Sequence, residues 1–417
     1  MAHPLLEIPS AYQRGEHLGI TSVCSAHPVV IEAALQLAKD LDKIVLIEAT
    51  CNQVNQDGGY TGMTPAEFRS FVEEIAKKVG YAAERIVLGG DHLGPNPWKG
   101  LPANEAMDKA EAMIIAYAKA GFTKLHLDTS MGCLGEPEAL EDAQTAQRAA
   151  RLAAAAESHM AATAPVYIIG TEVPVPGGAT HALDGIELTA PEAVAKTYDV
   201  HKQAFGALGL EDAFSRVIGL VVQPGVEFGH TDVIHFDATK STALTASLSK
   251  CPNIVFEAHS TDYQTVEGLR ALVANGFTIL KVGPWLTFAL REALYALDSI
   301  ADILEGTAPS NRLMSNMEQV MQASPDNWEK YYHGNQTELW VQRHFSFSDR
   351  IRYYWPDSQA RKAVDKLFSR LEGQEIPEPI LSQFLPLQAH MKNADCHQLL
   401  VNAVKLVLEK YDSAISA

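Results

Sequence analysis

Residues 85–128 read RIVLGGDHLGPNPWKGLPANEAMDKAEAMIIAYAKAGFTKLHLD. The stretch begins with a short apolar run at residues 85–90 and passes through a turn rich in glycine and proline. It continues with helical spacing over residues 104–120 and ends in a second apolar run at residues 124–128. A strand, a helix and another strand in this order predict a βαβ unit of a parallel sheet.

The same alternation fills the first three quarters of the chain. It predicts strands at residues 19–24, 44–49, 85–90, 124–128, 166–171, 217–222, 254–257 and 277–282. It predicts helices at residues 28–40, 65–79, 104–120, 137–159, 191–208 and 263–275. Thr64, Pro65 and Glu67 have the pattern of a capping box at a helix start. Eight strands in about 290 residues favour a closed (β/α)8 TIM barrel, an α/β fold, over an open doubly wound sheet.

Beyond Gly306 the alternation stops and the chain becomes richer in aromatic residues. We predict a barrel over residues 1–306 and a mostly helical extension over residues 307–417 that packs on it. Pro377 and Pro379 indicate a loop, and residues 396–410 a final helix. The aromatic run at residues 353–355 is expected to cover the barrel mouth, form a subunit interface or pack against barrel helices.

Composition excludes several classes of partner. The 417 residues include 51 acidic and 33 basic side chains, a formal charge of −18, which repels nucleic acid and anionic membranes. The chain shows neither a signal-peptide pattern nor eighteen consecutive apolar residues, so we expect a cytoplasmic protein. Five widely spaced cysteines indicate reduced thiols. No G-x-G-x-x-G follows the first strand and no G-x-x-x-x-G-K-[ST] occurs, so we expect no nucleotide cofactor and no kinase activity.

Polar residues follow every predicted strand, where a barrel carries its chemistry. They are Ser25, His27, Glu48, Asn52, Asp91, His92, His126, Asp128, Glu172, Gln223, Glu227, Glu257, His259 and Lys281. Each alone has a structural explanation, such as a helix cap or an ion pair. Together they predict a polar site, because burying so many ionisable groups without a ligand or metal is costly.

The stretch Gly89-Gly90-Asp91-His92 is the most informative of these. Glycine lets a backbone approach a ligand closely, and adjacent residues leave a strand end in different directions. One of the pair is therefore suited to proton transfer and the other to metal ligation. We predict as catalytic carboxylates Asp91, Glu172, Glu48 and Asp128. We predict a divalent metal, Zn or a similar ion, on His92, His259 and Glu257.

Two turns suggest an anion site, residues 175–178 and residues 281–287, since barrels often bind phosphate near the last strands. The residues expected to bind substrate or phosphate are Gly177, Gly178, Ser260, Lys281, Gly283, Asn52 and Gln223. Lys281 has two alternatives, a Schiff base and a structural ion pair.

Five strings together resemble the tagatose-bisphosphate aldolase Z-subunit family, the proteins called GatZ and KbaZ and often named tagatose 6-phosphate kinases. They are residues 19–28 (GITSVCSAHP), 48–56 (EATCNQVNQ), 90–95 (GDHLGP), 171–174 (TEVP) and 348–355 (SDRIRYYW). A more distant likeness is to class II aldolases, whose Asp-His pair matches Asp91 and His92. Gln223 and Glu257 depart from that pattern, so a metal site would have altered ligands.

The resemblance implies a tagatose or galactitol pathway and a phosphorylated ketohexose as substrate. We expect C4 epimerisation of D-tagatose 6-phosphate to D-fructose 6-phosphate by a retro-aldol route. Two alternatives are a non-catalytic Z subunit that stabilises an aldolase Y subunit, and an aldolase that acts alone. We also expect a homo-oligomer.

Overall fold

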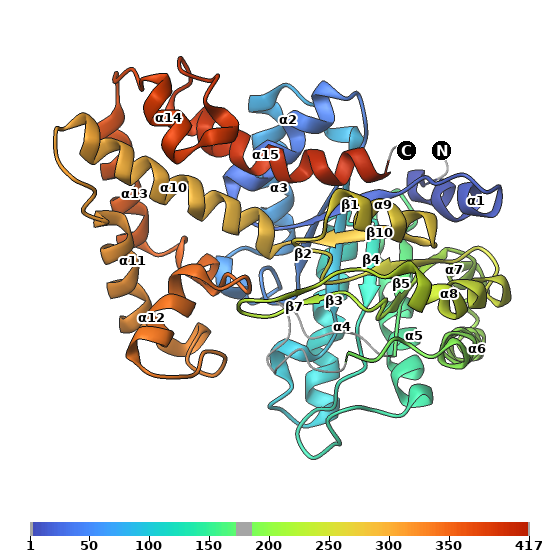
Figure 1. Ribbon diagram of the computed structural model, residues 1–417. Helices are drawn as coiled ribbons and strands as arrows, with labels where there is room; N and C mark the ends of the chain where they lie inside the picture. The colour runs from blue at the N-terminus through green and yellow to red at the C-terminus, as the bar shows by residue number, and fades with distance from the viewer. Residues whose placement is uncertain (1–2, 172–185, 416–417) are drawn as a thin grey trace.

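The computed structural model describes residues 3–171 and 186–415 and contains a closed barrel of eight parallel strands (Figure 1). The order around the barrel is β1-β10-β9-β6-β5-β4-β3-β2. The barrel strands are β1 (Ile20–Cys24), β2 (Val45–Thr50), β3 (Ile86–Leu93), β4 (Lys124–Leu127), β5 (Val166–Ile169), β6 (Val217–Val222), β9 (Val255–Ala258) and β10 (Phe277–Val282). A short antiparallel ribbon, β7 (Glu227–Phe228) and β8 (Val233–Ile234), follows β6. The predicted TIM barrel is confirmed.

Helices surround the barrel and form the extension. The helices that precede β10 in the chain are α1 (Glu7–Gln13), α2 (Pro28–Asp40), α3 (Pro65–Val79), α4 (Ala103–Lys119), α5 (Asp142–His159), α6 (Pro191–Ala207), α7 (Glu211–Ser215), α8 (Ala238–Ser247) and α9 (Val266–Ala274). Those after it are α10 (Pro284–Leu304), α11 (Arg312–Ala323), α12 (Gln336–Phe345), α13 (Ser358–Leu371), α14 (Glu378–Phe384) and α15 (Cys396–Ile415).

The interior of the barrel is apolar towards the end at which the strands begin. Ile20, Leu46 and Val87 pack there with Leu5 and Ile8 of the N-terminal segment. These side chains are buried, so the segment closes that end of the barrel. The predicted site residues Asp91, His92, His259 and Lys281 lie towards the opposite end, where the strands finish.

Within the barrel, three boundaries differ from the sequence prediction by three residues or more. Strand β3 continues to Leu93, and its register against β4 shifts between Gly90 and Leu93, so Asp91 and His92 belong to the strand. Helix α5 begins at Asp142, because the residues before it form a bridged loop. Helix α9 begins at Val266 behind the N-cap Thr265. The capping box of α3 is confirmed, with the Thr64 side chain accepting from the Glu67 backbone.

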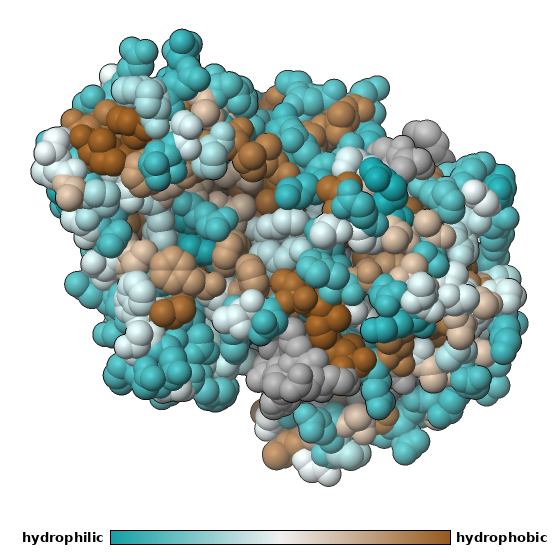
Figure 2. Space-filling model, in the orientation of Figure 1, coloured by the Kyte–Doolittle hydropathy of each residue, from teal (hydrophilic) through white to brown (hydrophobic). Residues whose placement is uncertain are grey.

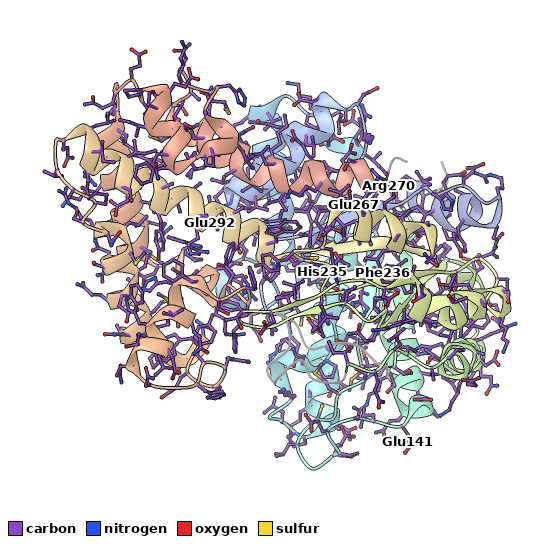
Figure 3. The ribbon with its side chains drawn as sticks, viewed as in Figure 1. Glu141, His235, Phe236, Glu267, Arg270 and Glu292 are labelled. Carbon is purple, nitrogen blue, oxygen red and sulfur yellow. The ribbon has the colours of Figure 1, made fainter. Side chains whose placement is uncertain are left out.

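The extension lies to one side of the barrel, and α15 returns from it to the barrel wall (Figure 1). Helix α15 packs against α2, α9 and α10 and contacts β1. The Arg270 side chain on α9, labelled in Figure 3, donates to the Ser413 carbonyl of α15 over 3.2 Å. The predicted helix at residues 396–410 is confirmed and runs on to Ile415. The division of the chain at Gly306 stays a prediction.

The face shown in Figure 2 is covered mostly by hydrophilic residues. Among the helices of the described ranges, none combines the length and the apolar character needed to span a membrane.

Candidate active site

A cavity of about 90 Å³ opens where the barrel strands end. Its lining includes seven of the predicted site residues: Asn52, Asp91, His92, His259, Ser260, Lys281 and Gly283. They come from β2, β3, β9 and β10 or from the segments just after these strands. The fold therefore gathers at one place groups that are as far apart as 231 positions in the sequence (Asn52 to Gly283).

Asp91 is the most heavily bonded carboxylate of this cavity. Its Oδ1 accepts hydrogen bonds from the His92 backbone N–H at 3.0 Å and from His126 Nδ1 at 2.9 Å, and lies 2.8 Å from Lys281 Nζ. Within the described residues its Oδ2 has only longer contacts, 3.8 Å to Cys24 Sγ and to His92 Nε2. Burial raises the pKa of Asp91, but His92 and Lys281 outweigh burial and hold it well below its usual value. The carboxylate is ionised, with one oxygen anchored and the other freer.

His92 lies near the end of β3 and has a left-handed backbone conformation, with φ of +50°. Its Nδ1 lies 2.8 Å from Asp128 Oδ2, and Ser130 Oγ donates to Asp128 Oδ1 over 3.0 Å. Burial lowers the pKa of His92, but the Asp91 and Asp128 carboxylates raise it above its usual value. Asp128 therefore orients the imidazole and leaves Nε2 for another partner, as outer carboxylates do for metal-binding histidines.

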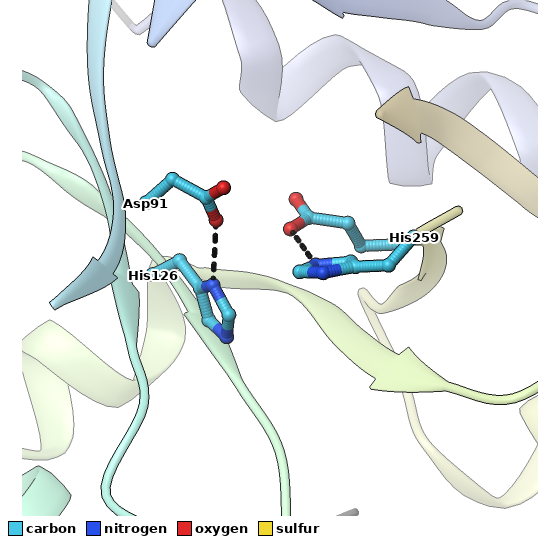
Figure 4. Close-up of side chains that lie close together, drawn as sticks. Asp91, His126 and His259 are labelled. Carbon is cyan, nitrogen blue, oxygen red and sulfur yellow. Dashed lines mark hydrogen bonds and ion pairs between the residues drawn. The ribbon is translucent and has the colours of Figure 1, made fainter. Parts of the chain in front are cut away.

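Three imidazoles meet above the barrel interior. The ring centre of His92 lies 5.1 Å from that of His126 and 5.0 Å from that of His259, and the latter two are 5.2 Å apart. Figure 4 shows His126 and His259 facing the same space beside Asp91. His126 Nε2 is buried and has no hydrogen-bond partner among the described residues. Sequence reasoning included His126 among the strand-end residues but gave it no role.

Four side chains can each place one ligand atom within 4.8 Å of the others: Asp91, His126, Glu257 and His259. Carboxylate oxygens and imidazole nitrogens at this spacing suit a divalent cation. His259 Nε2 lies 3.0 Å from Glu257 Oε1, and burial lowers the pKa of His259 to about 4. A neutral imidazole is the form that ligates metal.

A buried ion network lies beneath this cluster. Lys124 Nζ lies 2.6 Å from both Glu48 Oε1 and Glu257 Oε2, and all three side chains are fully buried. Lys281 Nζ lies 2.5 Å from Glu48 Oε2. Glu48, Glu257, Asp91 and Asp128 carry four negative charges against the two positive charges of Lys124 and Lys281, so this group of side chains keeps two negative charges when the imidazoles are neutral. A divalent cation would balance them.

Two of the predicted substrate residues, Gln223 and Gly283, have polar groups that are already bonded within the protein. The Gln223 side-chain oxygen accepts from the backbone N–H groups of Gly225 and Val226, at 2.8 and 3.1 Å, and so bonds to its own turn. The Gly283 N–H donates to Asp262 Oδ1 over 3.0 Å. Three predicted residues, Glu172, Gly177 and Gly178, lie outside the described residues.

The cavity also contains Arg352, Tyr60 and Asp262, which the sequence did not single out as site residues, and Tyr353 of the aromatic run at residues 353–355. Arg352 and Tyr353 come from the 3₁₀ helix at Arg350–Tyr354 in the extension, and Tyr60 and Asp262 come from loops after β2 and β9. The string at residues 348–355 was one of those carrying the family resemblance, which is the only signal that pointed to Arg352. The extension therefore contributes part of the wall of the site.

Comparison with known proteins gives consistent matches over the whole chain. The family model described as D-tagatose-1,6-bisphosphate aldolase subunit GatZ/KbaZ-like matches residues 5–416. A protein of Agrobacterium fabrum named D-tagatose 6-phosphate 4-epimerase is 52% identical, with 98% of each chain covered. A protein of Klebsiella pneumoniae named D-tagatose-1,6-bisphosphate aldolase subunit GatZ is 48% identical, with 97% of each covered.

A crystal structure is similar in fold as well as in sequence. It is that of a probable tagatose 6 phosphate kinase from Sinorhizobium meliloti 1021, with a TM-score of 0.88 and 58% identity. The match covers 95% of this chain and 100% of that one.

Proposed function

The chain belongs to the GatZ/KbaZ-like family, and from that premise we propose that it interconverts D-tagatose 6-phosphate and D-fructose 6-phosphate by inverting C4. The epimerase name of the Agrobacterium relative supports this substrate pair. The kinase name of the Sinorhizobium protein gains no support, because the sequence has no phosphate-binding G-x-x-x-x-G-K-[ST] loop.

The observation that carries the proposal is the freer oxygen of Asp91 beside three imidazoles in a cavity at the strand ends. The C4 hydrogen of a 2-ketose is β to the carbonyl, so its removal is not assisted by that carbonyl. Cleavage of the C3–C4 bond is assisted, because the electrons of that bond pass to C3 and on to the C2 oxygen. A base and a charge-stabilising group are what this route requires.

The reaction then balances without a redox step. Asp91 takes the proton of the C4 hydroxyl, C4 becomes an aldehyde carbon as the C3–C4 bond breaks, and C1 to C3 become an enediolate. The three-carbon aldehyde turns its other face, C3 attacks C4 again, and Asp91 returns the proton to the C4 oxygen. Lys281, 2.8 Å from Asp91 Oδ1, is the nearest fixed positive charge to this exchange.

The donor set fits a divalent ion, which His126, Glu257 and His259 would hold together with His92, whose ring Asp128 orients. Asp91 then stays free to act as the base. When bound, such an ion supplies Lewis acidity at the C2 oxygen. The protein's own contribution is to orient the imidazoles, exclude water and keep Asp91 ionised.

The experiment is an assay of the purified protein on D-tagatose 6-phosphate alone, followed by ¹³C NMR in heavy water. We expect D-fructose 6-phosphate to form with no solvent deuterium at C4, because the C4 hydrogen stays on the aldehyde fragment. Deuterium at C4 would contradict the retro-aldol route and indicate proton transfer at that carbon.

A second function is favoured by the Klebsiella relative, which is named as a subunit of an aldolase. In that case the chain would act by stabilising a partner aldolase subunit. The purified protein would then show no turnover alone, while its addition would raise the activity or half-life of a class II tagatose-bisphosphate aldolase.

A further inference from the structure

A second cavity lies beside the reaction cavity, and we infer that Arg352, which lines both, anchors the phosphate group of the substrate. The inference rests on the proposed function for the identity of that substrate. Phosphate recognition itself depends on the cavity and its side chains, whatever the rest of the substrate is.

The second cavity has a volume of about 310 Å³. It shares with the reaction cavity five lining residues: Cys24, Gln53, Tyr60, Gly283 and Arg352. Sites for small molecules usually measure about 300–1,000 Å³. The reaction cavity of about 90 Å³ is therefore too small to hold the whole substrate, whereas the two cavities together are large enough. A ketohexose phosphate therefore fits best with its carbon chain at Asp91 and its far end in the second cavity.

Arg352 is a cation that contacts no carboxylate among the residues of the described ranges. Its guanidinium donates to the backbone oxygens of Ser348 and Asp349 and, over 2.9 Å, to the Tyr353 hydroxyl. It forms no ion pair within the described ranges 3–171 and 186–415. Asp349 and Asp262 lie near enough to act on its charge but form no ion pair with it, so its planar fork is directed at neutral oxygens and suits phosphate oxygens.

Two of the other groups expected to bind phosphate, Lys281 and the Gly283 N–H, already have anionic partners. Lys281 Nζ lies between Glu48 and Asp91, at 2.5 and 2.8 Å. At the start of α10, the N–H groups of Gly283 and Trp285 both donate to Asp262 Oδ1, at 3.0 and 2.8 Å. The end of this helix is therefore occupied by a carboxylate, and Arg352 remains the better anchor.

Two further donors line the second cavity. Trp355 is 5% exposed, and its indole Nε1 has no hydrogen-bond partner among the residues described. Arg361 lies at the exposed rim and likewise forms no ion pair in that part of the chain. The buried Trp355 N–H is costly without a partner, and an anionic ligand would accept from it. Two guanidinium groups that form no ion pair within the described residues line the same cavity and suit the same ligand.

This position has a consequence for the reaction. Cleavage of the C3–C4 bond leaves the phosphate on the aldehyde fragment, C4 to C6. An anchor at Arg352 holds that fragment by its phosphate while C4 turns its other face towards the enediolate. Arg352 would thus be a specificity-determining residue that keeps the cleaved fragment for re-addition.

The test measures inorganic phosphate binding by calorimetry for the wild type, Arg352→Gln, Arg352→Lys and Lys281→Gln. Loss of a charge-assisted contact predicts about 10- to 100-fold weaker binding in Arg352→Gln and a smaller loss in Arg352→Lys. Lys281→Gln should bind phosphate within about threefold of the wild type, since its ammonium is directed at carboxylates. The same variants are compared on D-tagatose 6-phosphate and on unphosphorylated D-tagatose, and only the former should bind more weakly to Arg352→Gln.

Two outcomes would overturn the inference: phosphate binding that survives Arg352→Gln, or binding that is lost in Lys281→Gln alone. If Arg352→Gln does not fold, phenylglyoxal labelling of the wild type replaces it, and phosphate must protect the Arg352 peptide. A wild type without epimerase activity but with Arg352-dependent phosphate binding would refute the proposed function and leave the phosphate site standing. With activity present, Arg352→Gln should release more of the three-carbon aldehyde per turnover than the wild type.

Discussion

Replacement of Lys124 by methionine tests the buried ion network most directly. Lys124 Nζ is 2.6 Å from a carboxylate oxygen of Glu48 and of Glu257, with all three side chains at 0% exposure. Breaking a buried ion pair by removing one partner typically costs about 3–5 kcal/mol. At about 2.1 cal/mol/K per residue, a protein of 417 residues has an unfolding entropy of about 0.9 kcal/mol/K, so Tm should fall by about 3–6 °C.

The loss should depend on pH. Burial raises the pKa of Glu257, but Lys124 and Lys281 outweigh it and hold that pKa well below its usual value. In the wild type, the stability from this depressed pKa is present at neutral pH and is lost only as pH falls through the folded value. Without Lys124 one carboxylate should take up a proton, so its folded pKa rises and protonation becomes stabilising. The Tm difference between variant and wild type should therefore shrink from pH 7.5 to pH 5.

Scanning calorimetry measures both effects, with Lys240→Met as the matched control. Lys240 is 71% exposed, with its Nζ 3.9 Å from Asp237, so its loss should change stability by less than about 0.5 kcal/mol. Adding Glu257→Gln to Lys124→Met should recover part of the loss, because one unpaired charge is removed. Equal Tm values for Lys124→Met and the wild type, or a deficit that is the same at pH 5 and 7.5, would refute the reasoning.

Other predictions concern the site. Asp91→Asn should keep bound metal and substrate while turnover falls by about 10²-fold or more, as measured by steady-state kinetics with elemental analysis; normal turnover would remove Asp91 as the base. His92→Ala should lose both metal and turnover, and a variant that retains the full metal content would show that the ion is held without it. Burial raises the pKa of Glu227 to about 7, so the stability of its protonated form is present below about pH 4.5 and lost as pH rises through 7. Glu227→Gln should accordingly melt up to about 3 °C higher than the wild type at pH 8 and at the same temperature near pH 4.5, and the reverse order would contradict the shift.

The barrel was predictable because each strand is a short apolar run that ends at a polar residue, and this pattern is local. The continuation of β3 through Asp91 and His92 could not be predicted, because Gly89 and Gly90 suggest a turn. The register shift of β3 also depends on the neighbouring strand β4, which the local sequence does not reveal. Helix α9 was placed too early for a similar reason: Tyr263 adopts φ of +64°, which an apolar pattern does not reveal.

The site was predictable only as a group of strand-end residues. Lys124 begins a predicted strand, and a lysine is almost never fully buried unless it is paired. Its partners Glu48 and Glu257 lie on other strands, so nothing local indicates the pairing. Arg352 reaches the cavity from a segment more than 60 residues beyond the last barrel strand, a distance over which sequence spacing carries no geometric information.

The position of helix α15 affects how the chain folds during its synthesis. It packs against α2, α9 and β1, and the Gly19 N–H donates to the Ile415 carbonyl over 3.3 Å, so the first barrel strand is covered by residues synthesised after all eight strands. A nascent chain that has completed the barrel strands still exposes apolar surface of β1 and α2 until α15 emerges from the ribosome. Removal of α15 should therefore yield an aggregating barrel rather than a smaller stable enzyme, and chaperone demand should be greatest in that interval.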